Sequence, residues 1–130
     1  MSRKKNQLTE SEWQIMKAVW NAEPCAAPAV QEALQRRTGW SYSTVKTLMD
    51  RMVGKGLLKQ EKMRNLILYR AAITRKEAQR SEVMRTIKRA FNGALTPMMQ
   101  FLLESRVTKK QLDEIEKIIK SKKQKVKRKR

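Results

Sequence analysis

The sequence contains no histidine and only one cysteine, Cys25. Without histidine the commonest general base is missing, and one thiol makes neither a disulfide framework nor a zinc or copper site. The glycines are few and lack the spacing of a phosphate-binding loop. We therefore expect no catalytic residues, no metal and no cofactor, so the protein is predicted not to be an enzyme.

Long apolar runs are also absent. No stretch is long enough to span a bilayer, and the basic residues 1–6 are not followed by the apolar segment of a secretory signal. This predicts a cytoplasmic protein without membrane insertion. A chain of 130 residues fits one domain, or one small domain with an appendage, and has little surface to bury alone. We therefore expect oligomerisation to complete its core.

Acidic residues are scarce, at 12 against 31 Lys and Arg, which gives a formal net charge of +19. The excess is +7 in residues 1–72, from 13 basic and 6 acidic side chains, and +8 in residues 120–130, which have no acidic side chain. The front part is therefore basic without the tail. Nucleic acid is the expected partner, because binding releases condensed counterions. A merely solubilising surface is the alternative.

Two helices are predicted near the start of the chain. The first opens with a capping box, Thr9-x-x-Glu12, and ends before Pro24, since the residue preceding proline avoids the helical region. The second has Pro28 in its first turn and Gly39 just beyond its end. Apolar residues recur in both at helical spacing.

A third helix begins at Ser41, which can cap it, and ends near Gly54. Two extended runs follow, residues 57–62 and 66–71, and Asn65 between them tolerates a left-handed turn. Three helices followed by a hairpin are the order of a winged helix-turn-helix. The fold class is therefore mainly α with a small β-hairpin, in a winged helix-turn-helix domain of residues 1–72.

In such a fold, the first half of the third helix meets base edges and flanking cations hold phosphates. Short or flexible donors there, and cations near the hairpin tip, make up the predicted DNA-binding set. An amphipathic helix with a solvated face and exposed turn charges are the alternatives. The set is Ser43, Thr44, Lys46, Thr47, Arg51, Lys62 and Arg64.

Residues 73–120 are predicted to form a helical dimerisation region, because their apolar side chains are too many for short helices to cover. Packing back on the winged domain is the alternative. Residues 121–130 are expected to be a disordered basic tail that either adds DNA affinity or is solvated. The expected dimer contacts are Ile87, Phe91, Met98, Phe101, Leu102, Leu112, Ile115 and Ile119.

Two segments, LTESEWQIMKAVW (residues 8–20) and GWSYSTVKTLMDRMVGKG (residues 39–56), resemble the opening and recognition helices of the BlaI/MecI/CopY family, the penicillinase repressors of bacteria. The resemblance extends over about residues 7–120. It implies a dimeric repressor of inverted TACA/TGTA-type operators. It also implies that Thr44, Lys46, Thr47 and Arg51 face the DNA.

The resemblance also implies two routes of regulation. In one branch a membrane sensor of β-lactams triggers cleavage of an Asn-Phe bond, which corresponds here to Gln100-Phe101, so the first residue departs from the pattern. In the copper branch, C-terminal Cys-x-Cys motifs bind metal, and the absence of cysteine after Cys25 excludes that route. A rival function is sequence-independent nucleic-acid binding, as in packaging or RNA-associated proteins, which charge alone would drive.

Overall fold

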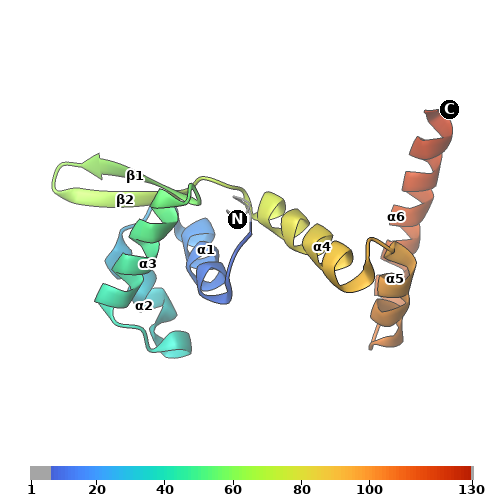
Figure 1. Cartoon of the computed structure of the whole chain (residues 1–130), viewed down its shortest axis with the longest axis horizontal. Coiled ribbons are helices and arrows are strands. Elements are labelled where there is room, and N and C mark those ends of the chain that lie inside the picture. Colours follow the sequence, from blue (N-terminus) through green and yellow to red (C-terminus); the bar gives the residue numbers. More distant parts are fainter. Residues whose placement is uncertain (1–6, 130) are drawn as a thin grey trace. The chain divides into compact units, whose positions relative to one another are not determined.

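The computed structural model describes residues 7–129, which form helices and one antiparallel hairpin (Figure 1). This confirms the predicted fold class. The chain divides into a winged unit that ends at Thr86 and a C-terminal unit that begins at Ile87. The elements are α1 (Glu10–Ala22), α2 (Ala27–Thr38), α3 (Tyr42–Gly54), β1 (Leu58–Met63), β2 (Leu66–Ala71), α4 (Arg75–Phe91), α5 (Leu95–Glu104) and α6 (Lys109–Arg128).

Local capping fixes the ends of the first three helices. At the start of α1, Glu12 N donates to Thr9 Oγ1 over 3.2 Å and Thr9 N donates to Glu12 Oε1 over 2.9 Å, as the capping box predicts. Gly39 ends α2 with a φ of 67°, a left-handed conformation that glycine adopts without strain. Ser41 then caps α3. Gly39 and Ser41 therefore define the turn between α2 and α3.

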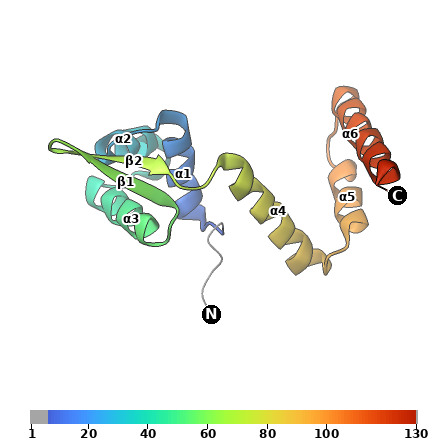
Figure 2. The ribbon, with the colours of Figure 1, turned by 90° about the horizontal axis from the view of Figure 1, so that it is seen from above.

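The hairpin pairs β1 with β2 from Leu58 opposite Ala71 to Met63 opposite Leu66, and its turn extends beyond the helices (Figures 1 and 2). At that turn Arg64 adopts the left-handed conformation, with a φ of 58°, rather than Asn65 as the sequence suggested.

A third short stretch of backbone joins the hairpin. Tyr69 N donates to Cys25 O over 2.8 Å, and Cys25 N donates to Tyr69 O over 3.1 Å. This bridge fixes β2 against the connection between α1 and α2.

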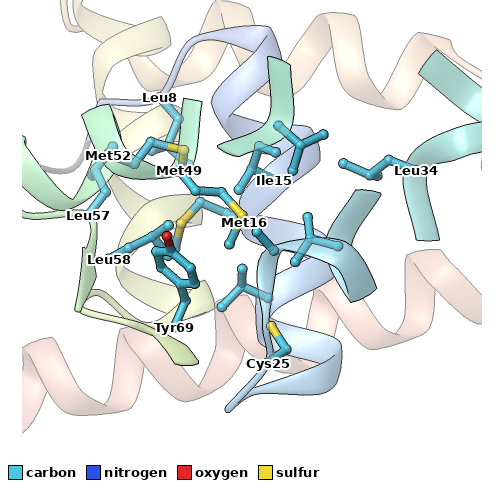
Figure 3. Packing of buried hydrophobic residues seen from close by; sticks show 14 of the residues in the cluster. Leu8, Ile15, Met16, Cys25, Leu34, Met49, Met52, Leu57, Leu58 and Tyr69 are labelled. Carbon is cyan, nitrogen blue, oxygen red and sulfur yellow. The ribbon is translucent and has the colours of Figure 1, made fainter. Parts of the chain in front are cut away.

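The core of the winged unit lies between α1, α2, α3 and the hairpin. Ile15, Met16 and Val19 from α1 meet Met49 from α3, and all four side chains are fully buried. Figure 3 shows Tyr69 of β2 among these residues, with its ring inside the core. Burial of each such side chain contributes about 1.5–3 kcal/mol, so this unit has a complete apolar core within one chain.

The start of α4 belongs to the winged unit. Trp20 Nε1 donates to Ile73 O over 3.0 Å, and the guanidinium of Arg75 lies 5.2 Å from the Trp20 ring. Ile73 and Ala78 are both buried in the same core. The compact unit therefore continues past the hairpin to Thr86 and takes in the first part of α4, whose Arg75 also donates to Asn21 Oδ1 of α1 over 2.9 Å.

The C-terminal unit has no comparable core among its described residues. In α4 and α5, Phe91 and Phe101 have ring centroids 6.0 Å apart, but Phe101 stays 63% exposed. The helix α6 continues to Arg128 and so includes residues 121–128, where the charge composition predicted disorder. Lys, Arg and Gln are good helix formers, and neither glycine nor proline interrupts this segment. Within residues 7–129 no helix is long and apolar enough to cross a membrane.

Candidate nucleic-acid interface

The outer face of α3 brings together four of the predicted DNA-binding residues. Val45, Met49 and Met52 point into the core and hold the helix in place. A surface groove opens on the other side, at the starts of α1 and α3. Its lining is Ser11, Trp40, Ser43, Thr44, Thr47, Leu48 and Arg51.

The start of α3 is organised by Ser41. Its Oγ accepts from Thr44 N over 3.2 Å, donates to Thr44 Oγ1 over 3.1 Å and lies 3.1 Å from Ser43 Oγ. Three hydroxyls are therefore gathered at the positive end of the helix dipole. Such a terminus is suited to phosphate oxygens and short hydroxyl contacts.

Lys46 differs from the other predicted contacts because the protein already holds its ammonium. Lys46 Nζ donates to Tyr69 OH over 2.8 Å and to Asp50 Oδ1 over 2.9 Å. Tyr69 OH in turn donates to Asp50 Oδ1 over 2.8 Å, and Gln60 Nε2 donates to the same oxygen over 3.2 Å. This cluster, which we call the Lys46 network, links α3 to both strands of the hairpin.

The Lys46 network also shifts the acid–base properties of its members. The hydrogen bond with Tyr69, followed by that with Asp50, raises the pKa of Lys46 well above its ordinary value. For Asp50, burial opposes ionisation, but the hydrogen bonds from Lys46 and Tyr69 outweigh it and lower the pKa. Both groups are therefore charged at neutral pH.

The hairpin supplies the remaining predicted cations. Lys62 and Arg64 are exposed at its tip, and within residues 7–129 neither forms an ion pair, nor does Arg51 of α3. These three side chains can therefore neutralise phosphates at no cost in internal pairs. By contrast, Arg70 on β2 donates to Glu61 Oε1 over 2.8 Å.

Asp50, Tyr69 and Gln60 are not among the residues predicted from the sequence. The i, i+4 spacing of Lys46 and Asp50 was a usable signal, because such residues lie on one helical face. The roles of Tyr69 and Gln60 depend on how the hairpin packs against α3. A local pattern does not give that information.

The expected dimer contacts differ in how far they are exposed in the single chain. Ile87 is buried, whereas Phe91, Met98 and Ile115 are half-buried. The others are exposed, namely Phe101, Leu102, Leu112 and Ile119. The Gln100-Phe101 bond lies inside α5, and both side chains are exposed.

Cys25 is buried, and burial, followed by the charge of Glu23, raises the pKa of its thiol. A raised thiol pKa disfavours the nucleophilic thiolate. Among the described residues no group of three or more Cys, Asp or Glu side chains is arranged to hold a metal ion.

In this structure α2 and α3 form a helix-turn-helix, α3 exposes a polar face, and a basic hairpin lies beside it. Together these features define a winged helix DNA-binding protein. The chain belongs to the penicillinase repressor family, which matches residues 8–121. This is a family of transcriptional repressors and not of enzymes.

Three individual relatives are similar to this chain. The methicillin resistance regulatory protein MecI of Staphylococcus aureus is 20% identical over 94% of this chain and 100% of its own length. The penicillinase repressor of Bacillus licheniformis is 24% identical over 87% of this chain and 89% of its own. An uncharacterised 16.5 kDa protein of Latilactobacillus sakei is 37% identical over 60% of this chain, a match that spans 53% of that relative.

A solved structure is similar to the winged unit. It is the monomeric form of Bacillus licheniformis BlaI in complex with the blaP half-operator, with a TM-score of 0.50 and 26% sequence identity. The match covers 57% of this chain and 90% of that one.

Proposed function

We propose that this repressor acts in the cytoplasm as a homodimer that occupies an inverted-repeat operator and presents α3 to the major groove. The observation that carries the proposal is the outer face of α3, where Ser43, Thr44, Thr47 and Arg51 share one groove. A two-fold dimer reads two half-sites on one side of the DNA. The related BlaI, bound to a half-operator as a monomer, supports one winged unit for each half-site.

The residue types indicate which group of the DNA each side chain would contact. The methyl group of Thr47 is suited to the methyl group of thymine, and Lys46 is suited to the acceptors of guanine. Arg51, one helical turn after Thr47, lies where it can hold a phosphate. The hairpin turn extends beyond the helices (Figure 2), so Lys62 and Arg64 would extend the basic surface along the neighbouring DNA backbone.

The exposed apolar side chains of the C-terminal unit support dimerisation. Phe101 and Leu102 are more than half exposed in the single chain, and Ile118 is 68% exposed. Large apolar side chains exposed in such number are typical of a protein interface. Pairing two copies would bury these side chains. It would also link two weakly binding winged units, so that the dimer binds the whole operator more tightly than either unit binds its half-site.

The test is a fluorescence-anisotropy titration at physiological salt. A duplex selected by the protein from a randomised library is compared with a scrambled duplex of equal length. A repressor should prefer the selected duplex by at least about 10³-fold and bind as two chains. Near equality, with a steep salt dependence, would favour the rival function of sequence-independent nucleic-acid binding.

The same proposal includes a route of release, in which a membrane sensor of β-lactams triggers cleavage at Gln100-Phe101. Within its own chain α5 buries none of its described residues and has no capping side chain at its start, so in a chain that is not paired the local unfolding that admits a protease costs little. Mass spectrometry of the protein from host cells grown with and without a β-lactam tests this. A chain that stays intact while repression is lifted would exclude cleavage.

A further inference from the structure

The Lys46 network places a flexible cation at a fixed point of the proposed interface. An ammonium has three N–H donors, and Tyr69 OH and Asp50 Oδ1 take two of them, at 2.8 and 2.9 Å. Asp50 Oδ2 also accepts from the same nitrogen, over 3.1 Å, and the two carboxylate oxygens can share one N–H in a bifurcated bond. The Lys46 side chain remains 29% exposed, so its third donor can still reach a ligand outside the protein.

The partners of Lys46 are themselves held firmly. Tyr69 is fully buried, and its backbone is bonded in both directions to Cys25. Its hydroxyl is therefore a stationary acceptor at the edge of the core. Asp50 is anchored by the Tyr69 hydroxyl and by Gln60, at 2.8 and 3.2 Å. An unrestrained lysine, by contrast, is a mobile point charge on a four-carbon stem.

We propose that Asp50 and Tyr69 are positioning residues that fix the Lys46 ammonium so that its remaining donor serves a base edge rather than the nearest phosphate. This inference rests on the function proposed above and adds a source of specificity to it. The Asp50 carboxylate also repels phosphates, so it lowers the affinity for every DNA sequence. Only a DNA sequence that places an acceptor in line with the third N–H of Lys46 gains a hydrogen bond that offsets this loss of affinity.

The key variant is Asp50→Asn, which keeps the shape of the side chain but releases Lys46. We expect the preference for operator over scrambled DNA to fall by about fivefold to 100-fold. Affinity for scrambled DNA should stay equal or rise, because a negative charge is lost and a cation is freed. Tyr69→Phe should shift the preference in the same direction.

The matched control is Glu61→Gln, which removes an exposed carboxylate that pairs with Arg70 on the hairpin and is not part of the Lys46 network. It should leave the preference unchanged. If Glu61→Gln and Asp50→Asn alter both DNA affinities alike, Asp50 is only a charge and the proposal is overturned.

A double-mutant cycle separates positioning from general loss of structure. In a Lys46→Ala background, Asp50→Asn should cause no further loss of operator preference, because the group that it positions is already gone. Additive losses would mean that Asp50 acts on its own, which also overturns the proposal.

A measurement without DNA distinguishes failure of the inference about Lys46 from failure of the proposed function. Mass spectrometry after brief treatment with an amine-acylating reagent compares the labelling of Lys46 with that of Lys62. Lys46 should be protected in the unchanged protein and labelled like Lys62 in Asp50→Asn. Equal labelling in the unchanged protein would show that Lys46 is not held. If the unchanged protein binds all duplexes equally, the proposed function fails, and labelling still decides whether Lys46 is held.

Discussion

The two units of the chain treat their apolar residues differently. In the winged unit Ile15, Met16 and Val19 lose all contact with solvent within one chain, whereas Phe101 and Leu102 of the C-terminal unit stay 63% and 52% exposed. Each unit has an amphipathic helix that begins with a capping box, α1 in one and α6 in the other, so helix formation does not separate them. The difference is that the apolar faces of α1, α2 and α3 pack against one another and against the hairpin. Among the described residues, α5 and α6 have no third layer to pack against. The winged unit is therefore stabilised by its own chain, whereas the proposed dimer would supply a second copy to cover the C-terminal unit.

The largest expected effect comes from removing the proposed shared surface. Phe101→Glu places a charge in the exposed apolar face of α5 and should give monomers in sedimentation. Operator affinity should fall by about 10²–10⁴-fold, because each half-site then binds without the effective concentration supplied by its twin. Gln100→Glu adds the same charge at the preceding exposed position and should preserve the dimer. A dimer that survives Phe101→Glu would mean that another surface pairs the chains.

A core substitution should have an effect of a different kind. Met49→Ala removes a fully buried side chain of α3 and should lower the free energy of unfolding by about 2–5 kcal/mol. Because that core lies within one chain, the loss should be the same at low and high protein concentration. The loss from Phe101→Ala should instead depend on concentration, as dimer stability does. Urea unfolding at two concentrations measures both, and a concentration-dependent loss for Met49→Ala would break the distinction between the units.

The contrast also explains which features of the fold could be predicted from the sequence. The capping box at Thr9 and Glu12, the left-handed Gly39 and the periodic core of α3 are local, and each confirmed a predicted element. What depended on distant contacts was harder to foresee. Ile73 is buried in the core of the winged unit, and its carbonyl accepts from the Trp20 indole 53 residues away, a contact that no local pattern shows.

The candidate site follows the same division. Helical spacing grouped the outer residues of α3 correctly on one face, including Thr44, Thr47 and Arg51. It could not reveal that Lys46 is held by a hydroxyl 23 residues away, because that requires the hairpin to fold onto α3. The helical course of residues 121–128 was missed for another reason: charge composition suggested disorder, while helix propensity favoured continuation of α6.

The basic end of α6 gives a smaller expected effect. Replacing the six Lys and Arg residues of positions 122–129 by Gln keeps the helix propensity and removes the charge. Operator and scrambled DNA should both weaken by about tenfold at physiological salt, and the salt dependence should flatten by about 0.9 for each lost phosphate contact.

Replacing Lys109 and Lys110 by Gln at the start of α6 is the control for loss of charge alone. If the tail variant changes the ratio of the two DNA affinities, the tail does more than contact phosphates. If it changes neither affinity, it is a solvated end, and DNA binding resides in the winged unit alone.

The smallest expected effect concerns the Lys46 network as a source of stability. The folded pKa of Asp50 lies below its ordinary value, so the ionised carboxylate stabilises the fold above that ordinary value, and this contribution disappears as the pH falls through the folded pKa. The unfolding free energy of Asp50→Asn should therefore lie below that of the unchanged protein at pH 5–8, and the two should converge below about pH 4. Because Asp50 is 46% exposed, the difference should be less than about 1 kcal/mol.

Urea unfolding across this pH range, repeated in a Lys46→Gln background, tests the origin of that difference. Without the ammonium, only the hydrogen bonds from Tyr69 and Gln60 still oppose the cost of burying the carboxylate, so the difference should shrink or vanish. A difference that grows as the pH falls would mean that burial outweighs the hydrogen bonds, and the network would then reduce stability. The small expected size is informative in itself: apolar burial keeps the winged unit folded, which leaves the Lys46 network free to serve recognition.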